Sequence, residues 1–129
     1  MARIVVIDAS VANAALSADD VHHQAASRAL ASTTDDEIVI AATTRAEVLI
    51  GPSRLGGTAL DIARDFIAGC VTVPVTARVA DHAALLRAHH RALSLPDAIA
   101  LTIAEAIEAD IVWTFDLRWR TVDSRVSIP

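Results

Sequence analysis

The sequence contains no lysine and no tyrosine, and its 129 residues include one cysteine, two tryptophans and two phenylalanines. All eleven basic residues are therefore arginines. P-loop nucleotide-binding proteins and protein kinases each place a lysine on the phosphates, so the absence of lysine excludes both classes. Because aromatic residues make up only 3%, the core has to be built from Val, Ile, Leu and Ala.

The sequence also lacks the features of an exported or membrane-bound protein. Its single cysteine, Cys70, cannot form an internal disulfide bond, and we expect it to be a small buried apolar residue. No apolar run approaches the roughly 18 residues of a membrane span, and Asp8 ends the first apolar run too early for a secretory signal. We therefore expect a cytoplasmic protein that does not associate with a membrane.

The composition predicts a folded, acidic domain. Hydrophobic residues make up 53% of the chain and charged residues 21%, which excludes a disordered chain, and the length predicts one domain at residues 1–129. The net charge of −5 is unlike that of most nucleic-acid-binding proteins, because phosphate backbones attract basic patches. If the protein acts on a nucleic acid, bound divalent cations would have to offset its acidic residues.

Short runs of β-branched residues alternate along the chain with longer amphipathic stretches. We predict strands at residues 3–7, 38–41, 71–75, 111–114 and 125–128, and helices at 10–16, from a cap at Asp19 or Asp20 to about 30, and at 44–50, 58–68, 76–90 and 96–108. Residues 51–57 (GPSRLGG) are expected to end one helix and form a flexible loop. Because helices separate the successive strands, this order predicts an α/β fold with a mainly parallel sheet.

Four carboxylates fall where predicted strands end or where predicted helices begin. Asp8 ends the first strand, and Asp116 follows the strand at 111–114 by two residues. Glu47 lies early in the helix after the second strand, and Asp97 lies in the first turn of the apolar helix at 96–108. Ligands of open parallel sheets bind beyond the carboxyl ends of the strands, so all four acids could converge on one crevice.

Each of these acids also has an ordinary structural explanation. Thr44 and Glu47 fit a capping box with Thr44 as N-cap, and Ser94 and Asp97 fit a weaker version of the same motif. Asp8 could cap the helix that follows it, and Asp116 could be a turn residue. Such a capping interaction contributes about 1 kcal/mol.

Taken together, the four acids favour a metal site. Two like charges about 4 Å apart repel by roughly 4 kcal/mol at an effective dielectric constant near 20, which is more than a cap contributes. Hard divalent cations relieve that repulsion, and Mg²⁺ or Mn²⁺ prefers carboxylate and water oxygens. No histidine lies near these acids in the sequence and Cys70 is distant, so a zinc site is not expected.

Two hydroxyl side chains stand two residues from an acid. Ser10 follows Asp8, and Thr114 precedes Asp116. These hydroxyls could orient carboxylates or a metal-bound water as second-shell groups, or they could simply close local backbone hydrogen bonds. The sequence leaves both roles open.

Segments 6–10 (VIDAS), 44–49 (TRAEVL), 95–100 (LPDAIA) and 114–116 (TFD) resemble, in order and spacing, the four acidic motifs of the PIN-domain family. The whole pattern resembles the VapC-type toxins of bacterial toxin–antitoxin pairs. This resemblance implies a three-layer α/β/α fold and an Mg²⁺- or Mn²⁺-dependent endoribonuclease that hydrolyses RNA, forms a homodimer and is held inactive by a cognate antitoxin protein. It also implies that Asp8, Asp97 and Asp116 ligate the metal and that Glu47 ligates it or orients the attacking water.

The chain departs from this family after the fourth acid, where members often carry a further Asp or Asn and this sequence has residues 117–120 (LRWR). Arg118 or Arg120 could contact RNA phosphate, or neither could. We expect Trp113 to lie in the core, and we expect Trp119 to be open and to contact RNA or a partner protein.

Two other functions remain as alternatives. The first is a PIN-like module that binds RNA or protein without catalysis, although a degenerate copy would be expected to lose acids. The second is a phosphohydrolase of the haloacid type. That class needs an Asp two residues after its nucleophile, where this chain has Ser10, and it normally uses a lysine.

The repulsion among the four acids predicts how the protein responds to divalent cations. Millimolar Mn²⁺ should raise the melting temperature, because the cation cancels the repulsion. Asp97→Asn should raise the melting temperature of the protein in EDTA by several degrees for the same reason. Thermal denaturation followed by circular dichroism measures both effects, and a melting curve that millimolar Mn²⁺ does not move would count against a converged cluster.

Overall fold

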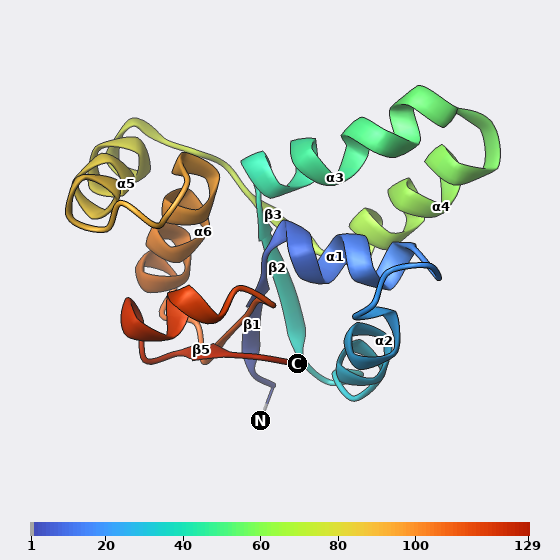
Figure 1. The fold of residues 1–129 in the computed structure, drawn as a ribbon, viewed down its shortest axis with the longest axis horizontal. Coiled ribbons are helices and arrows are strands. Elements are labelled where there is room, and N and C mark those ends of the chain that lie inside the picture. The colour runs from blue at the N-terminus through green and yellow to red at the C-terminus, as the bar shows by residue number, and fades with distance from the viewer. Residues whose placement is uncertain (1) are drawn as a thin grey trace.

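The computed structural model describes residues 2–129 and consists of a five-stranded sheet with helices on both faces (Figure 1). In chain order the elements are β1 (Ile4–Ile7), α1 (Ala9–Leu16), α2 (His23–Ala31), β2 (Glu37–Ala41), α3 (Ala42–Leu55), α4 (Gly57–Ala68), β3 (Val71–Val73), α5 (Ala77–His89), α6 (Leu95–Ala106), β4 (Ile111–Trp113), the 3-10 helix η1 (Leu117–Thr121) and β5 (Val126–Ser127). Every predicted strand and helix has a counterpart in this order.

The strands lie in the order β3-β2-β1-β4-β5, and each neighbouring pair is parallel. β1 is the middle strand, with Val6 opposite Val39 of β2 on one side and Val112 of β4 on the other. The chain builds β2 and β3 on one side of β1 and then crosses to add β4 and β5 on the other side. The gap between β1 and β4 is therefore the switch point of the sheet, where open α/β sheets bind ligands.

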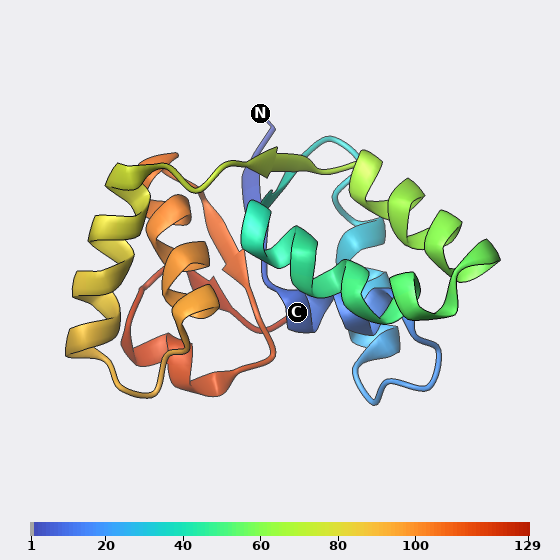
Figure 2. The ribbon, with the colours of Figure 1, turned by 90° about the horizontal axis from the view of Figure 1, so that it is seen from above.

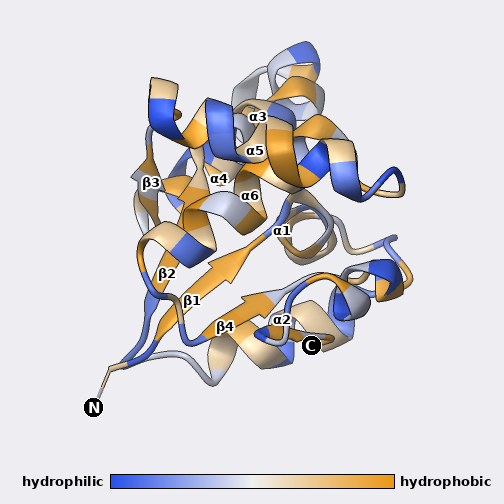
Figure 3. Ribbon diagram, turned by 90° about the vertical axis from the view of Figure 1, so that its left-hand side faces the viewer, coloured by the Kyte–Doolittle hydropathy of each residue, from blue (hydrophilic) through white to orange (hydrophobic). Residues whose placement is uncertain are grey.

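The two faces of the sheet pack against different helices. Val5, Ile7 and Ile40 lie in one core cluster with residues of α1, α2, α3 and α4, whereas Val6, Val39 and Val112 lie in a second cluster with residues of α6. α5 covers the outer side of α6 (Figures 1 and 2). The central strands β1 and β4 are apolar along their length, as is usual when both faces of a sheet are buried (Figure 3). The structure thus confirms the three-layer α/β/α fold with a parallel central sheet.

α6 is the most deeply buried helix of the fold, with every residue from 98 to 104 buried. Ser94 and Asp97 form the predicted capping box at its start, and Pro96 occupies the first turn, where its missing N–H is no loss. The small side chains of Ala100 and Ala104 pack in the core cluster with the strands and let the helix lie close to the sheet. Neither α6 nor any other helix within residues 2–129 is long and apolar enough to cross a membrane.

The structure corrects the prediction for α3. Thr44 is not its N-cap, because the helix begins two residues earlier, after Ala41, and no side chain caps it. The helix also continues through Pro52, so residues 51–57 are not a loop. The break comes at Gly56 and Gly57, which have φ angles of +66° and +54° that residues with a Cβ rarely adopt. The helix therefore ends at the backbone conformation of Gly56 and Gly57, and it does not end at Gly51 and Pro52.

Two further predictions were wrong in detail. α2 begins at His23 with His22 as N-cap, and Asp20 instead accepts a hydrogen bond from the His22 backbone N–H at 2.8 Å. Trp119 is not open but 1% exposed, because η1 turns its indole into the core cluster that contains Leu93 and Leu101. The prediction that Trp113 lies in the core is confirmed.

The burial of Trp119 predicts a large contribution to stability. Trp119→Ala should lower the free energy of unfolding by about 3–5 kcal/mol, because it leaves a cavity in the core. The matched control is Leu117→Ala, two residues away on η1 and 61% exposed, which should change stability by less than about 0.5 kcal/mol. Urea denaturation measures both variants, and equal effects would mean that Trp119 does not pack into the core.

Candidate active site

Asp8 lies at the carboxyl end of the middle strand, directly at the switch point of the sheet. Its backbone N–H donates to the Trp113 carbonyl of β4 at 3.2 Å, which continues the pairing of the two strands. Its side chain caps α1, since Oδ1 accepts a hydrogen bond from the Val11 backbone N–H at 3.1 Å. The capping role expected for Asp8 is thus present. At 7% exposure, Asp8 is also a buried carboxylate, which a cap alone does not require.

Two hydroxyl groups hold the Asp8 carboxylate in place. Ser10 Oγ donates to Oδ1 at 2.6 Å, and Thr114 Oγ1 donates to Oδ2 at 2.6 Å. The same hydroxyl oxygens accept backbone N–H groups after β4, from Phe115 to Ser10 at 3.1 Å and from Asp116 to Thr114 at 3.0 Å. Both hydroxyls therefore orient the Asp8 carboxylate, and of the two only Thr114 also closes a local backbone hydrogen bond. A role beside a bound metal ion stays a prediction. The network orients the carboxylate and joins the loop after β4 to the start of α1.

Burial sets the protonation behaviour of Asp8. It raises the pKa of this carboxyl group, and the negative charge of Asp97 raises it further. The hydrogen bonds from Ser10, Thr114 and Val11 favour the charged form and oppose this increase. The carboxylate is thus placed where a positive charge would stabilise it strongly.

Glu47 lies on α3 and shares this electrostatic environment. Partial burial raises the pKa of Glu47, and the charges of Asp97 and Asp8 raise it further. The capping box predicted for Thr44 and Glu47 is absent, because Thr44 does not cap α3. The structure therefore brings Asp8, Glu47 and Asp97 close enough for their charges to repel one another.

Asp97 has a structural role besides this electrostatic one. Its Oδ2 accepts a hydrogen bond from the Ser94 backbone N–H at 3.3 Å, and Ser94 Oγ accepts the Asp97 backbone N–H at 3.2 Å. The cap engages one oxygen of the carboxylate. A substitution of Asp97 would change both the helix cap and the repulsion among the acids. Glu47 caps no helix, so its substitution tests the repulsion alone.

Asp116 is oriented differently from the other three acids. It caps η1, and both of its oxygens accept hydrogen bonds from the Arg118 side chain, Oδ1 from Nε at 2.9 Å and Oδ2 from Nη2 at 2.6 Å. These bonds hold the pKa of Asp116 below its usual range. Asp116 is not among the groups whose charges raise the pKa of Asp8 or Glu47. The sequence left open whether Arg118 contacts RNA phosphate. In the structure its side chain binds Asp116.

The donor atoms of this crevice match a hard divalent cation, which prefers carboxylate oxygens and water. Within residues 2–129, no three His, Cys, Asp or Glu side chains are grouped closely enough to hold a metal ion between them. Mg²⁺ usually keeps several water ligands and binds through one or two carboxylates. One or two of Asp8, Glu47 and Asp97 could bind Mg²⁺ in that mode, whereas both oxygens of Asp116 already accept hydrogen bonds from Arg118.

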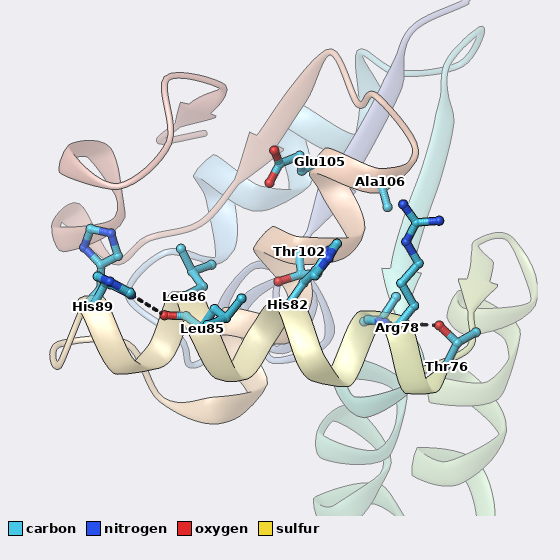
Figure 4. A pocket seen from close by; sticks show the side chains of 11 residues that line it. Thr76, Arg78, His82, Leu85, Leu86, His89, Thr102, Glu105 and Ala106 are labelled. Atoms are coloured by element: carbon cyan, nitrogen blue, oxygen red, sulfur yellow. Dashed lines mark hydrogen bonds between the residues drawn. The ribbon is translucent and has the colours of Figure 1, made fainter.

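Two of the cavities on the surface of residues 2–129 bear on the site, and the larger of these two contains none of the four acids. This groove, of about 760 Å³, lies between α5 and α6, where His82 and Leu86 face Thr102 and Glu105 (Figure 4). His82 and His89 both line this groove. The smaller cavity, of about 580 Å³, lies between α1 and α3, and Glu47 forms part of its wall.

The fold and the site together make this protein an α/β domain with a parallel sheet and an acidic crevice at the carboxyl end of its middle strand. The profile of the PIN domain family matches residues 5–124, and the chain belongs to this family. The predicted resemblance to PIN domains is confirmed.

Solved structures share this fold. VapC20 of Mycobacterium tuberculosis, a toxin that cleaves the sarcin–ricin loop, is similar at 20% identity and a TM-score of 0.79, over 92% of this chain and 94% of that one. A chain in a toxin–antitoxin complex from Klebsiella pneumoniae is also 20% identical, with a TM-score of 0.81 over 97% of both chains. A chain of FitAcB from Neisseria gonorrhoeae is 19% identical, with a TM-score of 0.72 over 95% of both. A search of curated protein sequences finds no significant match.

Removing the charge of Glu47 should stabilise the protein in EDTA. Its raised pKa means that the folded state binds the proton more tightly than the unfolded state, so Glu47 costs stability as the pH rises above about 4.3. Glu47→Gln should therefore raise the melting temperature at pH 7 by about 1–4 °C, a modest shift because water screens an exposed carboxylate. The difference should disappear below about pH 4. The exposed Glu105→Gln is the control, and a lower melting temperature for Glu47→Gln at pH 7 would contradict the shared repulsion.

Proposed function

We propose that this PIN domain is a divalent-cation-dependent endoribonuclease and acts as the toxin of a toxin–antitoxin pair. The observation that carries the proposal is the buried Asp8 carboxylate at the switch point of the sheet, which Ser10 and Thr114 hold in place. The charge of Asp97 acts on both Asp8 and Glu47. Carboxylates brought together lower the stability of a fold, and a bound divalent cation relieves their repulsion. The similarity to VapC20, a toxin that cleaves the sarcin–ricin loop, supports RNA as the substrate.

The four acids and two hydroxyls divide the work between them. Asp8, Asp97 and Asp116 would hold Mg²⁺ or Mn²⁺ directly or through water, and Glu47 would orient the attacking water or join the ligands. When bound, the cation supplies a water of lowered pKa and shields the charge that develops on phosphorus. Ser10 and Thr114 act on Asp8 as second-shell groups, because their hydrogen bonds leave its carboxylate little freedom to rotate.

Glu47 has the properties of the water-orienting group. It is exposed to solvent, and its raised pKa makes it a stronger proton acceptor than an ordinary glutamate. Glu47 would accept a proton from the water that attacks phosphorus. The bond from phosphorus to the 3′ oxygen would break, the 3′ oxygen would take a proton from solvent water, and the products would carry a 5′-phosphate and a 3′-hydroxyl. The rival, a PIN-like module that binds without catalysis, would not need a proton acceptor at this position.

An assay of RNA cleavage tests the catalytic proposal. The purified chain, freed of any antitoxin, should cleave structured RNA with Mg²⁺ or Mn²⁺ and lose activity in EDTA. Substitution of a residue that only supports a metal ligand typically lowers activity 10–100-fold. Asp8 is proposed as a ligand itself, so Asp8→Asn should lower the rate by at least about 100-fold. Asp61→Asn, exposed on α4, is the control and should keep the wild-type rate. Equal cleavage by wild type and Asp8→Asn, or no cleavage by either, would favour the non-catalytic module.

The cavity beside Glu47 suggests where an antitoxin docks. Its walls are mainly apolar, with Leu16 of α1 facing Val48, Ile50 and Leu55 of α3. Ile50 is 52% exposed and Leu55 is 78% exposed, so both would lose contact with water on binding an apolar segment. We propose that an antitoxin segment fills this cavity and closes access to Glu47. A homodimer is proposed from the family resemblance, and its interface is not assigned.

A pair of charge substitutions tests this docking surface. Buried apolar anchors commonly contribute 2 kcal/mol or more, so Leu55→Asp should weaken binding of the antitoxin by at least about 30-fold. The matched control is Leu85→Asp, at an exposed leucine of α5 that lines the other cavity. Binding is measured by calorimetry with the protein of a short reading frame adjoining the gene. Weaker binding by Leu85→Asp and not by Leu55→Asp would place the antitoxin on the α5–α6 groove instead.

A further inference from the structure

Asp116 is the proposed ligand that already has a cationic partner. Arg118 donates from Nε to Oδ1 and from Nη2 to Oδ2, so its planar guanidinium faces both oxygens of the carboxylate. This two-bond geometry is the one in which arginine binds carboxylates most strongly. The Arg118 backbone N–H also donates to Oδ1, so a cation that approaches in that plane finds only the outer lone pair of Oδ2 free.

The position of Arg118 relates it to a second acid of the crevice. The charges of Asp116 and, more weakly, of Asp97 both act on the Arg118 guanidinium. The guanidinium therefore lies within the electrostatic field of two of the four acids. An arginine in this position offsets part of the negative charge that a divalent cation would otherwise neutralise.

The pair is also easily broken. The side chain of Arg118 is 64% exposed and that of Asp116 is 25% exposed, and exposed ion pairs of this kind are weak. The turn does not depend on it, because the Arg118 backbone N–H donates to Asp116 Oδ1 at 3.0 Å. Any side chain at position 118 keeps that backbone bond. The guanidinium can therefore leave Asp116 without unfolding η1.

We propose that Arg118 is an internal counter-ion that competes with the divalent cation for the Asp116 carboxylate. Asp116 joins the other acids around the cation only after Arg118 releases it. This inference rests on the proposed function, because it takes Asp116 as a ligand of the cation. Arg118 is thus a positioning residue, which sets how readily the site accepts a cation by acting through Asp116.

Cation binding to the full-length chain without RNA tests this inference. Mn²⁺ is titrated into EDTA-treated and dialysed protein, and the free ion is measured by electron paramagnetic resonance. Arg118→Gln should bind Mn²⁺ about three- to fivefold more tightly than wild type, the change expected on removing a competitor held by an exposed ion pair. The matched control is Arg120→Gln, which removes the same charge from the same 3-10 helix and should change affinity by less than about twofold.

Two further measurements test whether Arg118 acts through Asp116. In an Asp116→Asn background, Arg118→Gln should no longer change the affinity for Mn²⁺, because the contested carboxylate is gone. In wild type, adding Mg²⁺ should shift the nuclear magnetic resonance signal of the Arg118 Nε–H as the ion pair opens. Melting curves of all variants confirm that each is folded.

The outcomes separate this inference from the proposed function. The inference would be overturned if Arg118→Gln and Arg120→Gln raised the affinity for Mn²⁺ equally, or if Arg118→Gln still raised it in the Asp116→Asn background. Either result would mean that Arg118 acts only through its positive charge and not by competing for Asp116. Weaker binding by Arg118→Gln, or an affinity that it leaves unchanged while wild type binds Mn²⁺, would overturn it and leave the proposed function standing. Absence of Mn²⁺ binding in wild type and in every variant would overturn both.

Discussion

The hydrogen bonds accepted by Asp8 join the middle strand of the sheet to its neighbour at the point where the chain changes sides. An unpaired carboxylate with 7% exposure would be costly, so the donors from Ser10, Thr114 and Val11 are what allow Asp8 to remain there. The same hydroxyls accept N–H groups from the loop after β4, which determines where that loop leaves the sheet. The other acids of the crevice are thus arranged around a carboxylate whose own orientation is already determined.

That arrangement lowers the stability of the fold, and a bound divalent cation would relieve the repulsion. The charge of Asp97 raises the pKa of both Asp8 and Glu47, and the charge of Asp8 also raises that of Glu47. Asp8 and Asp97 offset part of this cost as helix caps, whereas Glu47 caps no helix. Asp116 avoids the repulsion by pairing with Arg118. The chain has no lysine, so arginine is the only strongly basic side chain that could pair with Asp116. The planar guanidinium can form two parallel hydrogen bonds with a carboxylate or with a phosphate.

Much of the fold could be predicted, because its signals are local. The β-branched runs at β1 and β2, the apolar stretch of α6 and its Ser94–Asp97 capping box all depend on residues within one element. The errors arose where distant residues decide the outcome. α3 continues past Gly51 and Pro52 although their local preference is to end a helix, and Trp119 is buried because η1 folds back over α6 and the sheet.

The sequence by itself determined which acids could meet, since Asp8 and Asp116 follow strands, and the carboxyl ends of parallel strands share one edge of a sheet. It also placed the motifs that identify a PIN domain in their order. Only the tertiary structure decided how each acid is used: that Thr114, 106 residues away, orients Asp8, that Glu47 joins the crevice instead of capping its helix, and that Asp116 turns to Arg118. These outcomes depend on distances across the sheet, and no local pattern of residues encodes those distances.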